Sequence, residues 1–253
     1  MILEQFSLAG KVAIVTGCDT GLGQGMARAL AQAGADIVGV NVSEPRDTAA
    51  QVEALGRSFL DLRANLAETG CIEGLVKEAV RVCGRVDILI NNAGIIRRED
   101  AIKFSEKDWD DVMDINLKSV FFFSQAVARQ YIAQGRGGKI INVASMLSFQ
   151  GGIRVPSYTA SKSGVMGITR LMANEWASHG INVNAIAPGY MATNNTAALR
   201  ADESRNQAIL ERIPAGRWGK PDDLAGPVVF LASDASSYVN GYTIAVDGGW
   251  LAR

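Results

Sequence analysis

Hydrophobic and polar positions alternate between two patterns along this chain. Short runs of β-branched and aliphatic residues have the length of buried strands, and the longer stretches between them repeat apolar residues every three or four positions, as helices do. This alternation is typical of βαβ units, in which helices cover both faces of a parallel sheet. The expected strands are 11–16, 36–42, 58–62, 87–91, 138–144, 182–187 and 242–246.

The helices expected between these strands complete a single α/β fold. Seven strands predict one doubly wound, Rossmann-like parallel sheet with helices on both faces. We therefore expect one domain, 1–253, with a cofactor-binding part of about 1–145 and a catalytic and substrate part of about 146–253. The expected helices are 22–33, 49–56, 72–82, 106–133, 158–178 and 222–233.

The segment 194–212 has helical spacing and mixed charge, and it follows a Pro-Gly turn. Two interpretations fit this pattern. The segment is either a mobile helical flap over the site or an ordinary surface helix.

Composition excludes several classes of protein. With 48% hydrophobic and 20% charged residues, the chain resembles ordinary soluble globular proteins. Its 25 basic residues are spread along the sequence and balanced by 26 acidic ones, so nucleic acid is not an expected partner. Neither a signal peptide nor an apolar run of bilayer-spanning length is visible, so we expect a cytoplasmic protein without a membrane partner.

Cysteine and histidine usage narrows the chemistry further. The three cysteines, Cys18, Cys71 and Cys83, form no paired spacing, which suits reduced thiols in the cytosol. His179 is the single histidine, so neither a zinc cluster nor a serine–histidine hydrolase has its usual parts. No metal site is expected.

A glycine-rich loop follows the first expected strand. Glycines permit a tight turn and let main-chain N–H groups approach a pyrophosphate, and the following helix N-terminus favours negative charge. The alternative is a tight strand–helix connection without a ligand, but cofactors bind at this end of the first strand in βαβ folds. The loop's candidate cofactor contacts are Gly17, Asp19, Thr20, Gly21, Leu22 and Gly23.

The end of the second expected strand bears on cofactor choice. Asn41 stands where an acidic residue normally holds the adenosine ribose of NAD. An amide still accepts a hydrogen bond from a ribose hydroxyl, and no charge here repels a 2′-phosphate. The residues at this strand end favour NAD as the cofactor. NADP stays open, because Arg46 is close enough in sequence to reach the ribose. Asn65 and Leu66, after the third strand, complete the cofactor set at this end.

Tyr158 and Lys162 lie four positions apart in an expected helix and share one of its faces. A phenol has a pKa of about 10, and a neighbouring ammonium favours the phenolate. Such a pair can move the proton of an alcohol while hydride leaves the same carbon for a nicotinamide. Ser145 is expected to hydrogen-bond the reacting oxygen, and Lys162 also to reach the nicotinamide ribose. By spacing alone, Tyr-x3-Lys is also typical of a solvated helix face.

Taken together and in order, these motifs resemble the short-chain dehydrogenase/reductase family over essentially the whole chain. The resemblance implies an adenine-side turn at Asn91-Asn92-Ala93-Gly94 and a catalytic tetrad of Asn116, Ser145, Tyr158 and Lys162. It also implies that Asn116 holds a water that links Lys162 to solvent, and that the chain forms a homotetramer. A turn beside the nicotinamide is implied at Pro188, Gly189, Met191 and Thr193. Asn41 departs from the aspartate usual in the family's NAD-dependent members.

More narrowly, the segments 91–100, 145–158, 188–196 and 247–253 are similar to the 2-deoxy-D-gluconate 3-dehydrogenases, also described as 2-keto-3-deoxy-gluconate oxidoreductases of uronate and pectin breakdown. The resemblance implies a small sugar acid or keto sugar acid as substrate. A gluconate 5-dehydrogenase or another polyol or ketone reductase is the alternative within the family. An NAD-binding sensor or scaffold is the alternative outside catalysis.

The residues agree in part with an acidic substrate. Arginine binds carboxylates with two parallel hydrogen bonds, and three arginines follow strands on the side of the site. Each of them alone is also typical of a surface position. The candidate substrate contacts are Arg97, Arg98, Ser145, Met146, Gln150, Arg154, Tyr158 and Tyr190.

Overall fold

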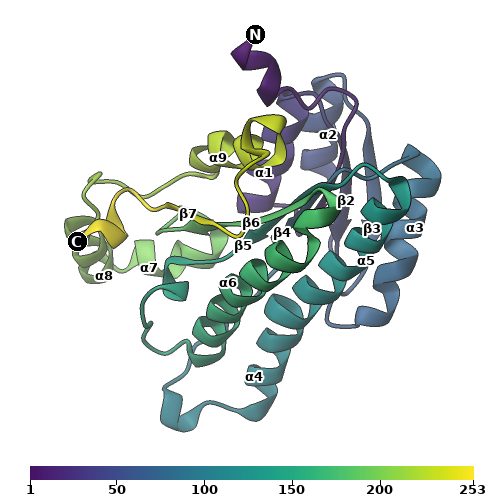
Figure 1. Cartoon of the computed structure of the whole chain (residues 1–253). Helices are drawn as coiled ribbons and strands as arrows, with labels where there is room; N and C mark the ends of the chain where they lie inside the picture. The colour runs from purple at the N-terminus through teal and green to yellow at the C-terminus, as the bar shows by residue number, and fades with distance from the viewer.

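The computed structural model describes all 253 residues and contains one seven-stranded sheet (Figure 1). The strand order is β3-β2-β1-β4-β5-β6-β7, and every neighbouring pair is parallel. The predicted doubly wound α/β sheet is therefore confirmed. The strands are β1 (Val12–Thr16), β2 (Asp36–Asn41), β3 (Phe59–Arg63), β4 (Ile88–Asn91), β5 (Gly138–Val143), β6 (Ile181–Pro188) and β7 (Thr243–Val246).

Two hydrophobic cores lie on opposite faces of the sheet. In β1, Ala13 and Val15 belong to the core shared with α1 and α9, while Val12 and Ile14 belong to the core shared with α3, α5 and α6. Successive side chains of a strand point to opposite faces, so a strand buried on both sides is apolar throughout. The α-helices are α1 (Gly21–Gln32), α2 (Arg46–Ala54), α3 (Ile72–Cys83), α4 (Glu106–Met113), α5 (Ser119–Gln134), α6 (Pro156–Trp176), α7 (Ala197–Ala201), α8 (Glu203–Arg212) and α9 (Ala225–Ala232).

The helical stretch predicted over 106–133 is present and contains a π-helical turn. Residues 106–134 are helical without a break, and the π-helical turn Asp114–Lys118 joins α4 to α5. Such turns insert one extra residue into a helix, and a hydrophobic pattern hardly registers a slip of one position. The turn places Asn116 inward, where it is fully buried.

The predicted helical segment 194–212 consists of two short helices. They meet at Asp202, whose side chain accepts a hydrogen bond from the main-chain N–H of Arg205 and so caps α8. Ile209 of α8 is buried in a small cluster with Met146 and Trp250. This packing holds α8 beside the carboxyl ends of the strands, and its mobility stays a prediction. No helix of the chain combines the length and apolar character needed to cross a membrane.

Candidate active site

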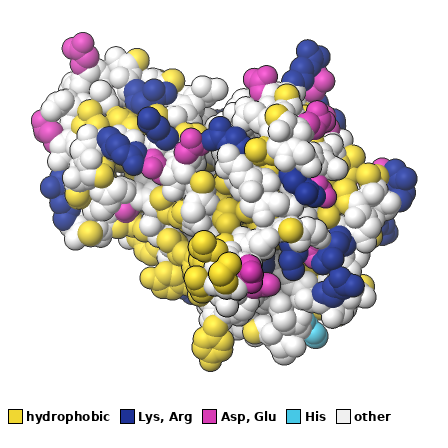
Figure 2. Space-filling view, turned by 90° about the horizontal axis from the view of Figure 1, so that it is seen from above, with side chains coloured by type: hydrophobic (Ala, Val, Ile, Leu, Met, Phe, Trp, Pro, Cys, Tyr) yellow, Lys and Arg dark blue, Asp and Glu magenta, His cyan; other side chains and the backbone are white.

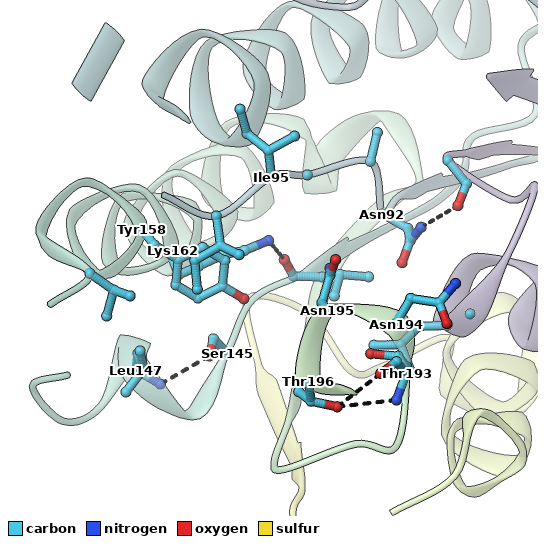
Figure 3. A pocket seen from close by; sticks show the side chains of 18 of the residues that line it. Asn92, Ile95, Ser145, Leu147, Tyr158, Lys162, Thr193, Asn194, Asn195 and Thr196 are labelled. Carbon is cyan, nitrogen blue, oxygen red and sulfur yellow. Dashed lines mark hydrogen bonds between the residues drawn. The ribbon is translucent and has the colours of Figure 1, made fainter. Parts of the chain in front are cut away.

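A cavity of about 940 Å³ opens at the carboxyl ends of the strands (Figure 3). Most of the residues predicted for the cofactor line it, together with most of those predicted for the substrate. The predicted cofactor residues in its wall are Gly17, Asp19, Thr20, Gly21, Leu22, Gly23, Asn41, Asn65, Leu66, Asn92, Ala93, Gly94, Tyr158, Lys162, Gly189 and Thr193. The predicted substrate residues in its wall are Arg98, Ser145, Met146, Gln150, Arg154, Tyr158 and Tyr190.

The glycine-rich loop is packed too tightly for side chains. A Cβ on Gly17, where φ is +63°, would lie 2.9 Å from the Cα of Ala93, and one on Gly23 would lie 2.0 Å from the carbonyl oxygen of Gly17. The Asn92 amide donates to the carbonyl oxygens of Thr16 (3.0 Å) and Gly17 (2.8 Å) and so ties the loop to the turn after β4. With the N-terminus of α1 beside it, this loop fits the pyrophosphate of a dinucleotide.

The adenosine end of the cavity carries no cationic side chain. Asn41 accepts a hydrogen bond from the main-chain N–H of Cys18 (2.7 Å), and its own amide nitrogen is buried without a partner. Asp19 lines the same end. Arg46 lies outside the cavity and pairs with Glu44 (2.8 Å). The local charge is therefore negative.

Tyr158, Lys162 and Ser145 converge on the floor of the cavity. Tyr158 and Lys162 belong to α6, and the Lys162 Nζ lies 5.7 Å from the centre of the Tyr158 ring. In Figure 3 the Tyr158 hydroxyl points toward Ser145, while the Lys162 amine donates to the carbonyl oxygen of Val143 (2.6 Å). The predicted proximity of the three side chains is therefore present.

The pKa of Tyr158 differs from the sequence-based expectation. Burial raises it above the usual 10, and the Ser145 hydroxyl and the charge of Arg98 lower it only in part. The expected lowering by Lys162 is absent, because the Lys162 amine is turned to Val143 and burial lowers its own pKa to about 8. At neutral pH Tyr158 is a phenol, the form that can donate a proton to a ketone.

The lowered pKa of Lys162 makes stability depend on pH. Between about 8 and its usual 10.5 the folded chain binds fewer protons than the unfolded one, so this residue's contribution to stability rises with pH across that window. We expect the wild type to gain on the order of 3 kcal/mol there, relative to Lys162→Met. Urea unfolding at several pH values measures this difference. Parallel profiles for the two proteins would contradict it, and Lys103→Met, an exposed lysine, is the control.

Asn116 does not line the cavity. Its side-chain amide donates to the carbonyl oxygen of Ile95 (2.9 Å), and its oxygen accepts from the N–H of the same residue (2.9 Å). The two hydrogen bonds fix the main chain of the loop after β4. Because Ile95 lines the cavity, Asn116 thereby helps to shape the cavity wall from behind. Its predicted water relay stays a prediction.

The three predicted arginines differ in their surroundings. Arg97 lies outside the cavity and pairs with Asp108 (3.4 Å). Arg154 lines the cavity but pairs with Asp100 (3.0 Å). Arg98 lines the cavity without a carboxylate partner, and its only hydrogen bond, at 3.3 Å, goes to a main-chain carbonyl. Arg98 is therefore the one free to meet an acidic ligand.

Two further arginines, missed from the sequence, come from α8. Arg205 and Arg212 both line the cavity. The Arg212 guanidinium lies 4.1 Å from the ring centre of Trp250, another lining residue, and 3.4 Å from the Gln150 side chain. The two arginines are seven positions apart, which is two helical turns and one face, and this spacing was the available signal.

Two residues predicted beside the nicotinamide lie behind the wall. Met191 is buried in the core and its sulfur would lie 2.2 Å from a Cβ on Gly219, and Pro188 ends β6 below the cavity surface. Of the predicted turn beside the nicotinamide, Gly189 and Thr193 thus face the cavity, and Pro188 and Met191 do not.

The Rossmann-like sheet, the glycine loop and the Ser145–Tyr158–Lys162 cluster define a nicotinamide-dependent oxidoreductase. A family model described as enoyl-(acyl carrier protein) reductase matches residues 17–251, and the chain belongs to the short-chain dehydrogenase/reductase family. The resemblance inferred from the motifs and the prediction of an oxidoreductase acting on CH–OH groups are confirmed.

Relatives of known sequence or structure share the full length of the chain. It is 75% identical to the 2-dehydro-3-deoxy-D-gluconate 5-dehydrogenase of Escherichia coli K12 over 100% of both chains. A structure from Agrobacterium tumefaciens with bound NADP, provisionally assigned as a 2-deoxy-D-gluconate 3-dehydrogenase, is 56% identical, with a TM-score of 0.93 and 98% and 99% of the two chains covered. A gluconate 5-dehydrogenase from Burkholderia cenocepacia in complex with NADP and tartrate is 40% identical, with a TM-score of 0.96 over 100% of both chains.

Proposed function

We propose that this chain transfers hydride between a nicotinamide cofactor and the secondary alcohol or ketone of 2-dehydro-3-deoxy-D-gluconate. The observation that carries the proposal is the cavity in which Arg98, free of any carboxylate, lines the same wall as Tyr158 and Ser145. A site with a proton donor and an unpaired guanidinium suits a small ketone that carries an acid group. The 75% identity to the enzyme named for that substrate supports it.

Four side chains divide the chemistry in this proposal. When bound, the nicotinamide gives or accepts the hydride at the substrate carbon. In the reductive direction, Tyr158 gives its proton to the oxygen that was the carbonyl, and Ser145 hydrogen-bonds that oxygen. Lys162 holds the nicotinamide ribose, and Asn116 links Lys162 to solvent through a water. The part of about 1–145 is proposed to bind mainly cofactor and the part of about 146–253 mainly substrate, with Arg98 and Lys162 among the exceptions.

The acid group of the substrate meets Arg98 in this proposal. Arg205 and Arg212 lie on the α8 side of the same cavity and add positive charge. Gln150 is placed to bond sugar hydroxyls, while Met146 and Tyr190 wall the pocket.

Turnover assays test the substrate. Purified protein is supplied with 2-dehydro-3-deoxy-D-gluconate, 2-deoxy-D-gluconate and gluconate, each with NAD and NADP, and the absorbance of reduced nicotinamide is followed. The proposal expects the highest kcat/KM with 2-dehydro-3-deoxy-D-gluconate. A second candidate, gluconate 5-dehydrogenase activity, is favoured by the Burkholderia cenocepacia structure, and a higher kcat/KM with gluconate would establish it instead.

The preferred cofactor in this proposal is NAD. The adenosine end holds the Asp19 carboxylate and no cation, and a carboxylate repels the 2′-phosphate of NADP. Unit charges a few ångströms apart near a protein surface interact by about 1–4 kcal/mol. We therefore expect Asp19→Asn to raise kcat/KM for NADP about tenfold, with little change for NAD.

Steady-state kinetics with NAD and with NADP, which give kcat/KM for each cofactor, test this prediction. Glu53→Gln is the matched control, because Glu53 is an exposed carboxylate of α2 that lies outside the cavity. An unchanged ratio of NAD to NADP kcat/KM in Asp19→Asn would show that this carboxylate does not select the cofactor.

The assembly we propose is a cytoplasmic homotetramer. Large apolar side chains stay exposed on α4, α5 and α6, at Trp109, Phe122 and Leu171, and just before β7 at Tyr242. Figure 2 shows hydrophobic side chains gathered into a patch on one face of the molecule. Exposed apolar patches of this kind mark subunit contacts. The C-terminal segment 248–253 is a further candidate for such a contact. Sedimentation velocity tests the state, and a monomer would overturn it.

A further inference from the structure

A second cleft lies at the opposite end of the sheet from the active-site cavity. Its volume is about 780 Å³, and the amino ends of β1, β4, β5 and β6 form its floor. Lys11 precedes β1, Asp87 precedes β4, Lys139 is the second residue of β5, and Asn182 is the second of β6. None of these residues takes part in the proposed reaction.

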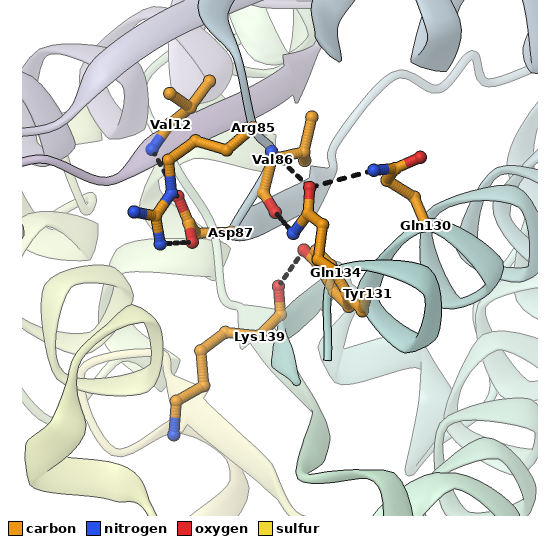
Figure 4. Close-up of polar contacts among 8 residues, drawn as sticks. All are labelled: Val12, Arg85, Val86, Asp87, Gln130, Tyr131, Gln134 and Lys139. Atoms are coloured by element: carbon orange, nitrogen blue, oxygen red, sulfur yellow. Dashed lines mark hydrogen bonds and ion pairs between the residues drawn. The ribbon is translucent and has the colours of Figure 1, made fainter. Parts of the chain in front are cut away.

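One ion pair in this cleft is fully satisfied. Asp87 accepts hydrogen bonds from the Arg85 Nε (2.8 Å) and from the main-chain N–H of Val12 (2.9 Å), and a second guanidinium nitrogen of Arg85 completes a bidentate contact (Figure 4). The Asp87 side chain is only 9% exposed. This carboxylate is therefore not available to the other cations of the cleft.

Three cations remain, and they face a single free carboxylate. Lys11, Arg136 and Lys139 line the cleft and form no salt bridge, and Asp234 is the other acidic residue in its wall. With the Arg85–Asp87 pair neutral, the cleft carries an excess of about two positive charges.

Lys139 is half-buried in this cleft and has no salt-bridge partner. Its side chain points away from Asp87 in Figure 4, and its amine donates only to the Asn182 side chain (2.8 Å). The pKa of Lys139 is lowered to about 8, mainly by burial; Asp234 opposes this lowering in part and the nearby charge of Lys11 adds to it. A half-buried ammonium without a counter-charge reduces stability unless a ligand supplies the charge.

Cations at this end of the sheet could simply stabilise the C-termini of neighbouring helices, but the contacts do not support this explanation. The C-termini of α5 and α9 point to this end of the sheet, and cations stabilise such ends by bonding the last carbonyls. Neither Lys11, Arg136 nor Lys139 donates a side-chain hydrogen bond to a main-chain carbonyl. The last turn of α5 is closed instead by the N–H of Gly135, which bonds two of its carbonyls.

We propose that this cleft is a binding site for a phosphate group, free or as a phosphate monoester, held by Lys139, Lys11 and Arg136. A compact dianion matches the excess charge of about two, and ammonium and guanidinium groups form strong charge-assisted hydrogen bonds to phosphate oxygens. The cleft has room beyond the phosphate itself for a small organic group.

Isothermal titration with inorganic phosphate tests the site on enzyme saturated with NAD, which keeps the probe out of the dinucleotide loop. Ionic strength is held constant with chloride. We expect one phosphate per chain, with Kd raised at least about tenfold by Lys139→Met, as the loss of one charge-assisted hydrogen bond implies. Lys139→Arg keeps the charge and should keep binding within a few-fold. A sugar phosphate titrated in parallel distinguishes a monoester from the free ion.

Thermal unfolding provides a second readout. Without phosphate, Lys139→Met should melt no lower than the wild type, because it removes an uncompensated charge, and phosphate should raise the melting temperature of the wild type only. Lys103→Met, which lies outside the cleft, should respond as the wild type does. No phosphate binding by the wild type would overturn the proposal, and so would equal affinity in Lys139→Met. If Lys139→Met does not fold, Lys11→Met takes its place with the same outcomes.

Discussion

Replacing Tyr158 by phenylalanine is expected to lower kcat about 10²- to 10⁴-fold, the usual contribution of a positioned acid or base. The change removes only the hydroxyl, which points toward Ser145 on the floor of the cavity. Without it, the proposed proton donor to the substrate oxygen is lost, and Ser145 remains only as a hydrogen-bonding group. Steady-state kinetics on 2-dehydro-3-deoxy-D-gluconate measure kcat, and titration with NADH checks that cofactor binding stays within a few-fold.

Tyr131→Phe is the matched control for Tyr158→Phe. Tyr131 is also buried, but its hydroxyl donates to the main-chain carbonyl of Lys139 (3.2 Å), outside the active-site cavity. The control variant should keep its kcat and lose only a little stability. A Tyr158→Phe enzyme with more than about a tenth of the wild-type kcat would show that Tyr158 is not the proton-transferring group.

Replacing Arg98 by leucine is expected to lower kcat/KM for the sugar acid about 10- to 100-fold. Hydrogen bonds to charged groups contribute about 1.5–3 kcal/mol. Of the three arginines predicted from the sequence, Arg98 is the one that lines the cavity without a carboxylate partner. Because binding of the acid group is affected more than the chemistry, most of the loss should appear in KM. Kinetics on the substrate and on its neutral primary amide measure the effect.

Arg97→Leu provides the comparison for Arg98→Leu at the adjacent position. Arg97 forms surface ion pairs with Asp108 and Asp111 outside the cavity, so its loss should leave kcat/KM unchanged and cost little stability. If Arg98→Leu lowers kcat/KM equally for the acid and for its neutral amide, the arginine does not bind the carboxylate.

Local patterns were sufficient for the sheet. β1 is apolar on both faces over Val12–Val15 because it lies between two helical layers, and this produces the continuous apolar run recognised in the sequence. Glycine spacing was equally informative, since Gly17 and Gly23 stand where any Cβ would collide with the main chain or with Ala93. Such requirements are local and leave a trace in the order of residues.

The sequence by itself thus determined the α/β class and the family, and it predicted the side chains that the fold brings together at Ser145, Tyr158 and Lys162. Only the tertiary structure decided which arginine lacks a carboxylate partner, because Arg97 and Arg98 are adjacent and alike in sequence. Arg97 pairs with Asp108 of α4, whereas Arg98 contacts only a main-chain carbonyl before α7. The tertiary structure also decided that burial raises the pKa of Tyr158, and that the Lys162 amine donates to the carbonyl oxygen of Val143. Ion pairing and burial depend on neighbours distant along the chain, which a local pattern does not contain.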